Sequence, residues 1–175
     1  MKNLKSILLF VFAAITLISC DKDDDNGAAV VANEFTYQGV TYPLTKGILE
    51  SFGENENGSF DFDISLFSDG IILDVPNETV TGSGQAVYLD LNSNSMNGLV
   101  NGTYNFAIER DAFTIVDGFV ATEIDVATQT FVAAQVTAGN VVLTINNGQY
   151  TILFNLQDAA GEDIVGSYQG TLTVF

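Results

Sequence analysis

The eight residues FDFDISLF, at positions 60–67, decide the fold class of this 175-residue chain. Apolar side chains at 60, 62, 64 and 66 alternate with polar ones at 61, 63 and 65. Successive side chains of a β-strand point to opposite faces, so this alternation predicts a strand with one face in an apolar core and one in water. An amphipathic helix would instead place its apolar residues three or four positions apart.

The same period of two recurs along the chain. Residues 150–156 alternate in this way, although Leu153 breaks the polar side, and residues 104–108 give a shorter example. Asn146-Asn147-Gly148 separates 141–145 from 150–156, and this predicts a hairpin because Asn and Gly tolerate the positive φ of tight turns. Further turns are predicted at Ser68-Asp69-Gly70 and Asp117-Gly118.

These patterns predict a single all-β domain over residues 34–175, with nine or ten short strands in an antiparallel arrangement. Roughly 140 residues are enough to bury one core. We expect a two-layer β-sandwich, because the polar row at 61 and 63 suits a solvated outer face. A closed, lipocalin-like β-barrel is the alternative.

The first nineteen residues have the organisation of a cleaved signal peptide. Lys2 and Lys5 precede the apolar run from Ile7 to Leu17. The run has a length of roughly 7–15 residues, as expected of a signal-peptide core, and it is shorter than the roughly 20 residues of a membrane-spanning helix. We therefore expect residues 1–19 to be removed on export.

Leu17-Ile18-Ser19-Cys20 follows that run and resembles the lipobox of bacterial lipoproteins. The resemblance implies cleavage between Ser19 and Cys20 and attachment of a diacylglyceryl group to the Cys20 sulfur. Cys20 is the only cysteine in the chain. Several acyl chains would anchor the protein stably, which a single chain does not.

The residues behind the cysteine are acidic. Lys22, Asp23 and Asp24 resemble the export signal of Bacteroidota surface lipoproteins, which implies an outer-membrane location facing the cell exterior. Residues 20–33 also have the composition of a flexible tether. The segments NEFTYQGVTYPLTKGILESFG, NGTYNF and QYTILFNLQDAAGEDIVGSYQGTL are similar to small Bacteroidota lipoproteins of unassigned function, a resemblance that brings no catalytic residues.

Composition excludes several classes of chemistry. The chain has no histidine, so triads and metal sites built on imidazole are absent. After cleavage, three basic residues face 22 acidic ones, a net charge of −19, which disfavours nucleic acid as a partner. The main enzymatic option left is a carboxylate pair of the glycosidase type.

The favoured hypothesis is a non-enzymatic binding or adhesion module for glycans or proteins. Tyr88 is the most interesting candidate, because it shares a strand face with Ala86 and Asp90, opposite apolar Val87, Leu89 and Leu91. The alternative for its ring is packing into the core. The full set of candidate contacts consists of tyrosines and loop amides: Tyr37, Tyr42, Tyr88, Asn92, Asn94 and Asn97.

Two further hypotheses concern assembly and calcium. Residues 166–173 either form a sheet edge that pairs with a partner subunit, or an interior strand whose glycines fit close packing. The aspartates at 21, 23 and 25 have the spacing of an EF-hand, but Asn26 and Ala32 occupy its glycine and glutamate positions. Asp69 and Asp74 remain as weak calcium candidates, and no other cofactor is expected.

Overall fold

The computed structural model describes residues 31–175. The predicted signal peptide, Cys20 and the export signal at Lys22, Asp23 and Asp24 lie outside the described residues. Within them, Asn33 is tied to the folded domain: its Nδ2 donates to the Gln169 carbonyl at 3.0 Å and its Oδ1 accepts from the Gln169 N–H at 2.7 Å. No helix in residues 31–175 is long and apolar enough to span a membrane.

The all-β prediction is confirmed. Residues 31–175 form a twelve-stranded sheet, with one short 3₁₀ turn at Val75–Asn77. The strands are β1 (Glu34–Tyr37), β2 (Val40–Pro43), β3 (Lys46–Glu54), β4 (Phe60–Phe67), β5 (Ile71–Asp74), β6 (Thr79–Ser93), β7 (Gly102–Phe106), β8 (Thr114–Asp125), β9 (Thr130–Asn146), β10 (Gln149–Asp158), β11 (Asp163–Gly170) and β12 (Thr173–Val174).

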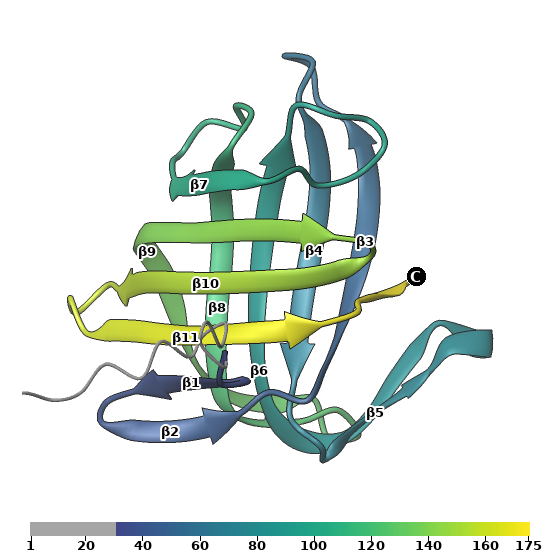
Figure 1. The fold of residues 1–175 in the computed structure, drawn as a ribbon. Helices are drawn as coiled ribbons and strands as arrows, with labels where there is room; N and C mark the ends of the chain where they lie inside the picture. The colour runs from purple at the N-terminus through teal and green to yellow at the C-terminus, as the bar shows by residue number, and fades with distance from the viewer. Residues whose placement is uncertain (1–30) are drawn as a thin grey trace, which may run out of the picture. The chain divides into compact units, whose positions relative to one another are not determined.

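The sheet curls so that it forms two facing layers. Strands β3, β4, β6 and β8 make one layer, and β7, β10, β11, β1 and β2 run across it in the other (Figure 1). The long β9 belongs to both, because residues 130–135 pair with β8 and residues 136–146 pair with β10. The result is one curled sheet whose hydrogen-bonded strand order runs from β12 to β2.

Two pairings differ from the expected antiparallel pattern. Strand β7 runs parallel to β8, and β12 runs parallel to β3. Both involve short stretches, with two paired residues each, at places where the chain crosses from one layer to the other. The sheet is therefore mixed.

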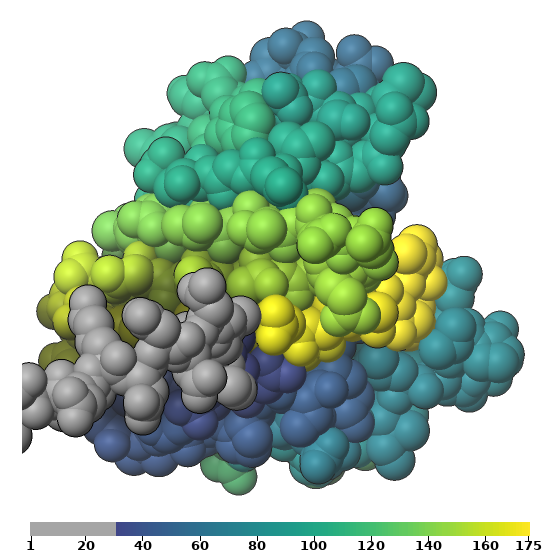
Figure 2. Space-filling model, in the orientation of Figure 1, coloured from purple at the N-terminus to yellow at the C-terminus, as the bar shows by residue number. Residues whose placement is uncertain are grey.

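The main core lies between the layers, and separate from it is a smaller buried cluster of Ile48, Phe67, Ile71, Ala86 and Ala121. The main core is built from the apolar faces of both layers, as the alternation at 60–67 predicts: Phe62, Ile64 and Leu66 are buried. A space-filling view shows β7, β9, β10 and β11 stacked side by side over this core, with the arm formed by β5 and the start of β6 standing out beside them (Figure 2).

The edge-strand alternative for residues 166–173 is wrong for β11. This strand lies between β10 and β1 and is paired on both sides. Gly166 permits the close packing there, since a Cβ at this position would lie 2.4 Å from the Phe154 ring and 2.5 Å from the Glu34 carbonyl oxygen. The interior-strand alternative is therefore correct for residues 166–167, which pair on both sides, whereas Thr173 lies in β12, which pairs with β3 and ends the strand order.

Candidate binding face

Four carboxylates face each other across four adjacent strands on the outer face of the β3–β4–β6–β8 layer. Glu50 on β3 is paired with Asp63 on β4, Asp63 with Asp90 on β6, and Asp90 with Asp117 on β8. We call these four residues the carboxylate row. Like charges directly opposite one another destabilise a sheet, so this row needs compensation from its surroundings.

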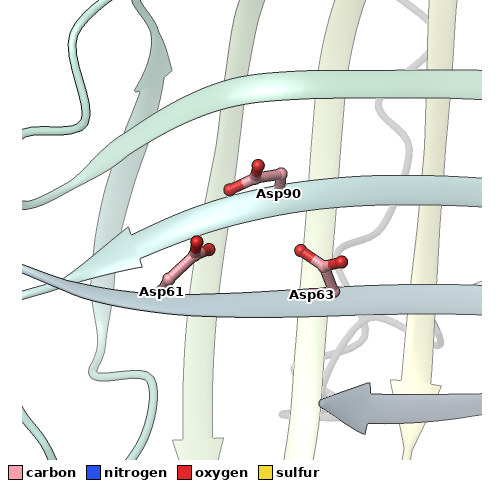
Figure 3. A group of neighbouring side chains, drawn as sticks. All are labelled: Asp61, Asp63 and Asp90. Carbon is pink, nitrogen blue, oxygen red and sulfur yellow. The ribbon is translucent and has the colours of Figure 1, made fainter. Parts of the chain in front are cut away.

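Asp61, two residues before Asp63, brings another carboxylate to the same face. Figure 3 shows Asp61 and Asp63 rising from β4 beside Asp90 on β6, and one oxygen of each lies within 4.8 Å of the others. Such a group of oxygen ligands has the composition of a divalent-cation site. The structure, however, places a side-chain cation among them.

That cation is Arg110, from the loop between β7 and β8. Its guanidinium binds Asp90 with two hydrogen bonds, Nη1 to Oδ1 at 3.0 Å and Nη2 to Oδ2 at 2.7 Å. Nη1 also donates to Asp61 Oδ2 at 2.7 Å. A forked guanidinium bound to carboxylates in this way is a strong, orientation-specific contact. A metal ion at this position would have to displace Arg110.

One guanidinium does not neutralise three carboxylates, and burial makes the excess charge costly. Desolvation raises the pKa of Asp63 to about 6, against the opposing effect of a hydrogen bond from Tyr88. Desolvation also raises the pKa of Asp90, against the opposing effect of Arg110. Asp61 Oδ1 is buried without a hydrogen-bond partner among the described residues.

Tyr88 joins the carboxylate row to an aromatic region. Its hydroxyl donates to Asp63 Oδ2 at 2.7 Å, and burial is the largest cause of the raised pKa of this hydroxyl. Its ring stacks on Phe119 with 5.2 Å between the ring centroids. The predicted strand face of Tyr88 is correct, since Ala86 and Asp90 share its side of β6 while Val87, Leu89 and Leu91 lie in the core.

Beyond Phe119, the same outer face continues as an open apolar hollow between β8 and β9. The hollow has a volume of about 490 Å³ and is lined by Phe119, Ile124, Phe131, Ala133 and Gln135. Phe131 is 69% exposed and is paired with Ile124, one residue from the start of β9. Gln135 donates to Asp117, which joins the hollow to the end of the carboxylate row.

The loop that carries Arg110 is fixed by the β3–β4 turn. Asn57 Nδ2 donates to the Arg110 carbonyl oxygen at 2.9 Å. Asn55 Nδ2 donates to Asn92 Oδ1 at 2.8 Å. Asn92 is fully buried and its own N–H₂ group reaches Thr114 Oγ1 at 3.3 Å, so it supports this loop and is not available to a ligand at the surface.

The other predicted contacts lie apart from this face. Tyr37 donates to Asp158 Oδ2 at 2.8 Å, and Tyr42 stacks on Phe35. Asn94 and Asn97 are exposed in the β6–β7 loop. The structure therefore does not gather the predicted contacts into one site, and of the six only Tyr88 lies beside the carboxylate row and the hollow.

The two calcium candidates are also separate from each other and from the carboxylate row. Asp69 lies in the β4–β5 turn, 3.9 Å from Lys46 Nζ, and Asp74 Oδ2 accepts a hydrogen bond from Asn77 at 2.8 Å. Within residues 31–175, the acidic residues that do gather are Asp61, Asp63 and Asp90.

Sequence reasoning missed Arg110 and the pairing that forms the carboxylate row. One signal was present in the composition. Arg110 is one of only two basic residues between 31 and 175, where 18 are acidic, so any ion pair of a buried carboxylate in this range had to involve one of these two. The hollow at Phe119 and Phe131 gave no signal, because apolar residues in a strand normally indicate the core.

Comparison of the chain with known protein families, with curated proteins and with solved structures found no match.

Proposed function

We propose that this protein is a lipid-anchored cell-surface lipoprotein that acts as a non-enzymatic binding module. Cys20 would carry the lipid, and the domain from residue 34 would present its binding face to the surroundings. The observation that carries the binding function is the outer face of β3–β4–β6–β8–β9, where a row of carboxylates adjoins an apolar hollow open to solvent.

Both parts of this face, the carboxylate row and the apolar hollow, are unfavourable for the stability of the folded domain. Directly opposed carboxylates repel, and an exposed phenylalanine leaves apolar area in water. The described residues also provide a rigid support for the face, because Tyr88, Arg110 and the β3–β4 turn hold the side chains in place. A prearranged polar and apolar surface of this kind suits recognition of a ligand.

The same geometry gives less support to a glycosidase. Such an enzyme needs one carboxyl free to donate a proton and another free to attack or to activate water. Arg110 occupies both oxygens of Asp90 and one of Asp61, and Tyr88 occupies one of Asp63. Asp117, at the end of the row, is bound to Gln135.

Binding is tested by screening the purified mature protein against arrays of glycans and peptides, alongside Phe131→Ser and Leu153→Ser. Both side chains are exposed, at 69% and 43%, but Leu153 lies on β10 in the opposite layer. A ligand that is lost in Phe131→Ser and kept in Leu153→Ser is expected. The proposal fails if every ligand found is retained by the Phe131 variant.

Location is tested by treating intact cells with protease and following the protein by immunoblot, with a periplasmic protein as control. Loss of the protein with survival of the control is expected. Survival of both, when lysed cells show that the domain is cleavable, would place the domain in the periplasm and contradict the export signal.

One observation favours a second function, assembly through a sheet edge. Strand β5 pairs only with β6 among the described strands, and Ile72 on it is 61% exposed. A partner strand could add to this edge. A molar mass that rises with concentration, measured by light scattering, and falls back to the monomer in Ile72→Pro would support this alternative.

A further inference from the structure

The chemistry of the hollow and its rim identifies the class of ligand. We infer that the face binds an extended, cationic and amphipathic polypeptide segment, with an apolar side chain in the Phe119–Phe131 hollow and a basic side chain at the carboxylate row. This inference rests on the proposed binding function and adds the partner class to it.

The hollow determines the apolar half of the ligand. Its apolar lining consists of two aromatic rings, an isoleucine and an alanine. The only polar side chain that lines it, Gln135, is already bound to Asp117. A polar group placed here would lose water without gaining a hydrogen-bond partner, so the hollow suits an aromatic or aliphatic side chain.

The rim determines the charged half. The carboxylate row carries four acids and Asp61 adds a fifth, while among residues 31–175 Arg110 is the one basic side chain bound to them. Asp117 is exposed at the end of the row nearest the hollow. An additional cation at this end would relieve the repulsion that Arg110 leaves uncompensated.

The spacing between these two halves fits a polypeptide in extended form. Phe119 is two residues beyond Asp117 on β8, and both lie on the outer face, so they stand about 7 Å apart along the strand. Residues i and i+2 of an extended segment have the same separation and point the same way. A basic residue two positions from an apolar one would therefore meet both halves.

The charge of the domain argues against the other occupants of such a face. Residues 31–175 contain 18 acidic and two basic residues. A second copy of the chain would bring another strongly acidic surface against the row, and an anionic lipid surface would be repelled. A cationic polypeptide is attracted over the whole approach.

The test uses the peptide Lys-Ser-Phe-Ser-Lys-Ser-Phe, capped at both ends, with binding to the mature protein measured by fluorescence anisotropy. Two control peptides replace the lysines by glutamate or the phenylalanines by serine. We expect binding of the first peptide only, weakened at least about tenfold by Phe131→Ser and about two- to fivefold by Asp117→Asn. Raising the salt concentration should weaken it as well.

Two matched variants report on specificity. Leu153→Ser removes an exposed apolar side chain from the opposite layer, and Glu162→Gln removes an exposed charge from the β10–β11 turn. Both should bind the peptide as the unaltered protein does. Circular dichroism of every variant would verify that its fold is retained.

Three results overturn the inference: no binding at millimolar peptide, binding unaffected by Phe131→Ser, or self-association of the protein that this substitution abolishes. A glycan or an acidic peptide that depends on Phe131 would also overturn it, but would leave the proposed binding function standing. Failure of the proposed function itself gives a different result. In that case, every ligand found in the screen of glycans and peptides binds the Phe131→Ser variant as it binds the unaltered protein.

Discussion

Arg110 holds together the most highly charged part of the described domain. It is the one side chain that binds Asp61 and Asp90 simultaneously, and its backbone carbonyl is bound in turn by Asn57. The guanidinium therefore compensates the negative charge of the carboxylates. The hydrogen bond to the backbone carbonyl attaches the β7–β8 loop to the β3–β4 turn.

Replacing Arg110 by methionine should lower the free energy of unfolding by about 2 kcal/mol, because it leaves buried carboxylates without their cation. The value is set below that of a fully buried pair because the Arg110 side chain is 42% exposed. Arg110→Lys should have a free energy of unfolding between those of the original protein and the methionine variant, since lysine keeps the charge but lacks the forked guanidinium. Urea unfolding at pH 7.5 measures both; a methionine variant as stable as the original would contradict this role.

Asp63 makes the stability of the domain depend on pH in an unusual direction. Its pKa is raised to about 6 in the folded protein, from an ordinary value of 3.8. Between these two values the folded state binds more protons than the unfolded state, so stability falls as the pH rises through this range. We expect Tm to be higher at pH 5 than at pH 7.5.

Asp63→Asn should remove part of that difference and raise Tm at pH 7.5 by roughly 2–4 °C, or about 1 kcal/mol after allowance for the partial exposure of Asp63. Thermal unfolding followed by circular dichroism at both pH values measures the effect. The matched control is Glu78→Gln at an exposed turn, which should leave the pH dependence unchanged. Equal pH dependence in the Asp63 variant and the original would contradict the assignment.

At the scale of the strand, close packing around β11 places a strict limit on side-chain size. Gly166 lies against the Phe154 ring and the Glu34 carbonyl oxygen, and the backbone of β1 cannot withdraw without breaking its pairing. Gly166→Ala should therefore cost at least about 2 kcal/mol, as overpacking does in other cores. Val165→Ala, next to it but 49% exposed, should cost less than about 1 kcal/mol.

Urea unfolding of the two variants decides this prediction. A Gly166 variant that loses no more stability than the Val165 variant would mean that β1 adjusts to the additional methyl group. In that case β1 and β2 would be a loosely held edge and not an integral part of the sheet.

Local elements of this fold were predictable from sequence, whereas their registers were not. The alternation at 60–66 assigns the correct faces of β4, and Asn147-Gly148 forms the predicted β9–β10 turn, with φ of 50° and 77°. Both are short-range properties. The carboxylate row depends on how four strands align, and alignment is determined by contacts between residues distant in sequence.

The same limit applies to the site. The outer face of Tyr88 and Asp90 followed from alternation, but their partners did not, because Arg110 comes from a loop and Phe119 from β8. The prediction of a solvated row at 61 and 63 was incomplete for this reason: the row is on the outer face, yet Arg110 and Tyr88 partly cover it. Loop positions above a sheet carry no periodic signal.

At the scale of the whole molecule, charge is the dominant feature, and it makes a prediction that separates general from specific effects. With 18 acidic and two basic residues between 31 and 175, self-repulsion opposes the compact state. Raising NaCl from 0.01 to 0.1 M shortens the Debye length from about 30 to about 10 Å, so Tm should rise by a few degrees.

Calcium chloride at matched ionic strength should raise Tm by the same amount, because Arg110 already occupies the space among Asp61, Asp63 and Asp90. A larger rise with calcium that disappears in Asp61→Asn would show instead that the cation displaces Arg110 and binds these carboxylates, and a rise that disappears only in Asp69→Asn or Asp74→Asn would move the calcium site to those turns.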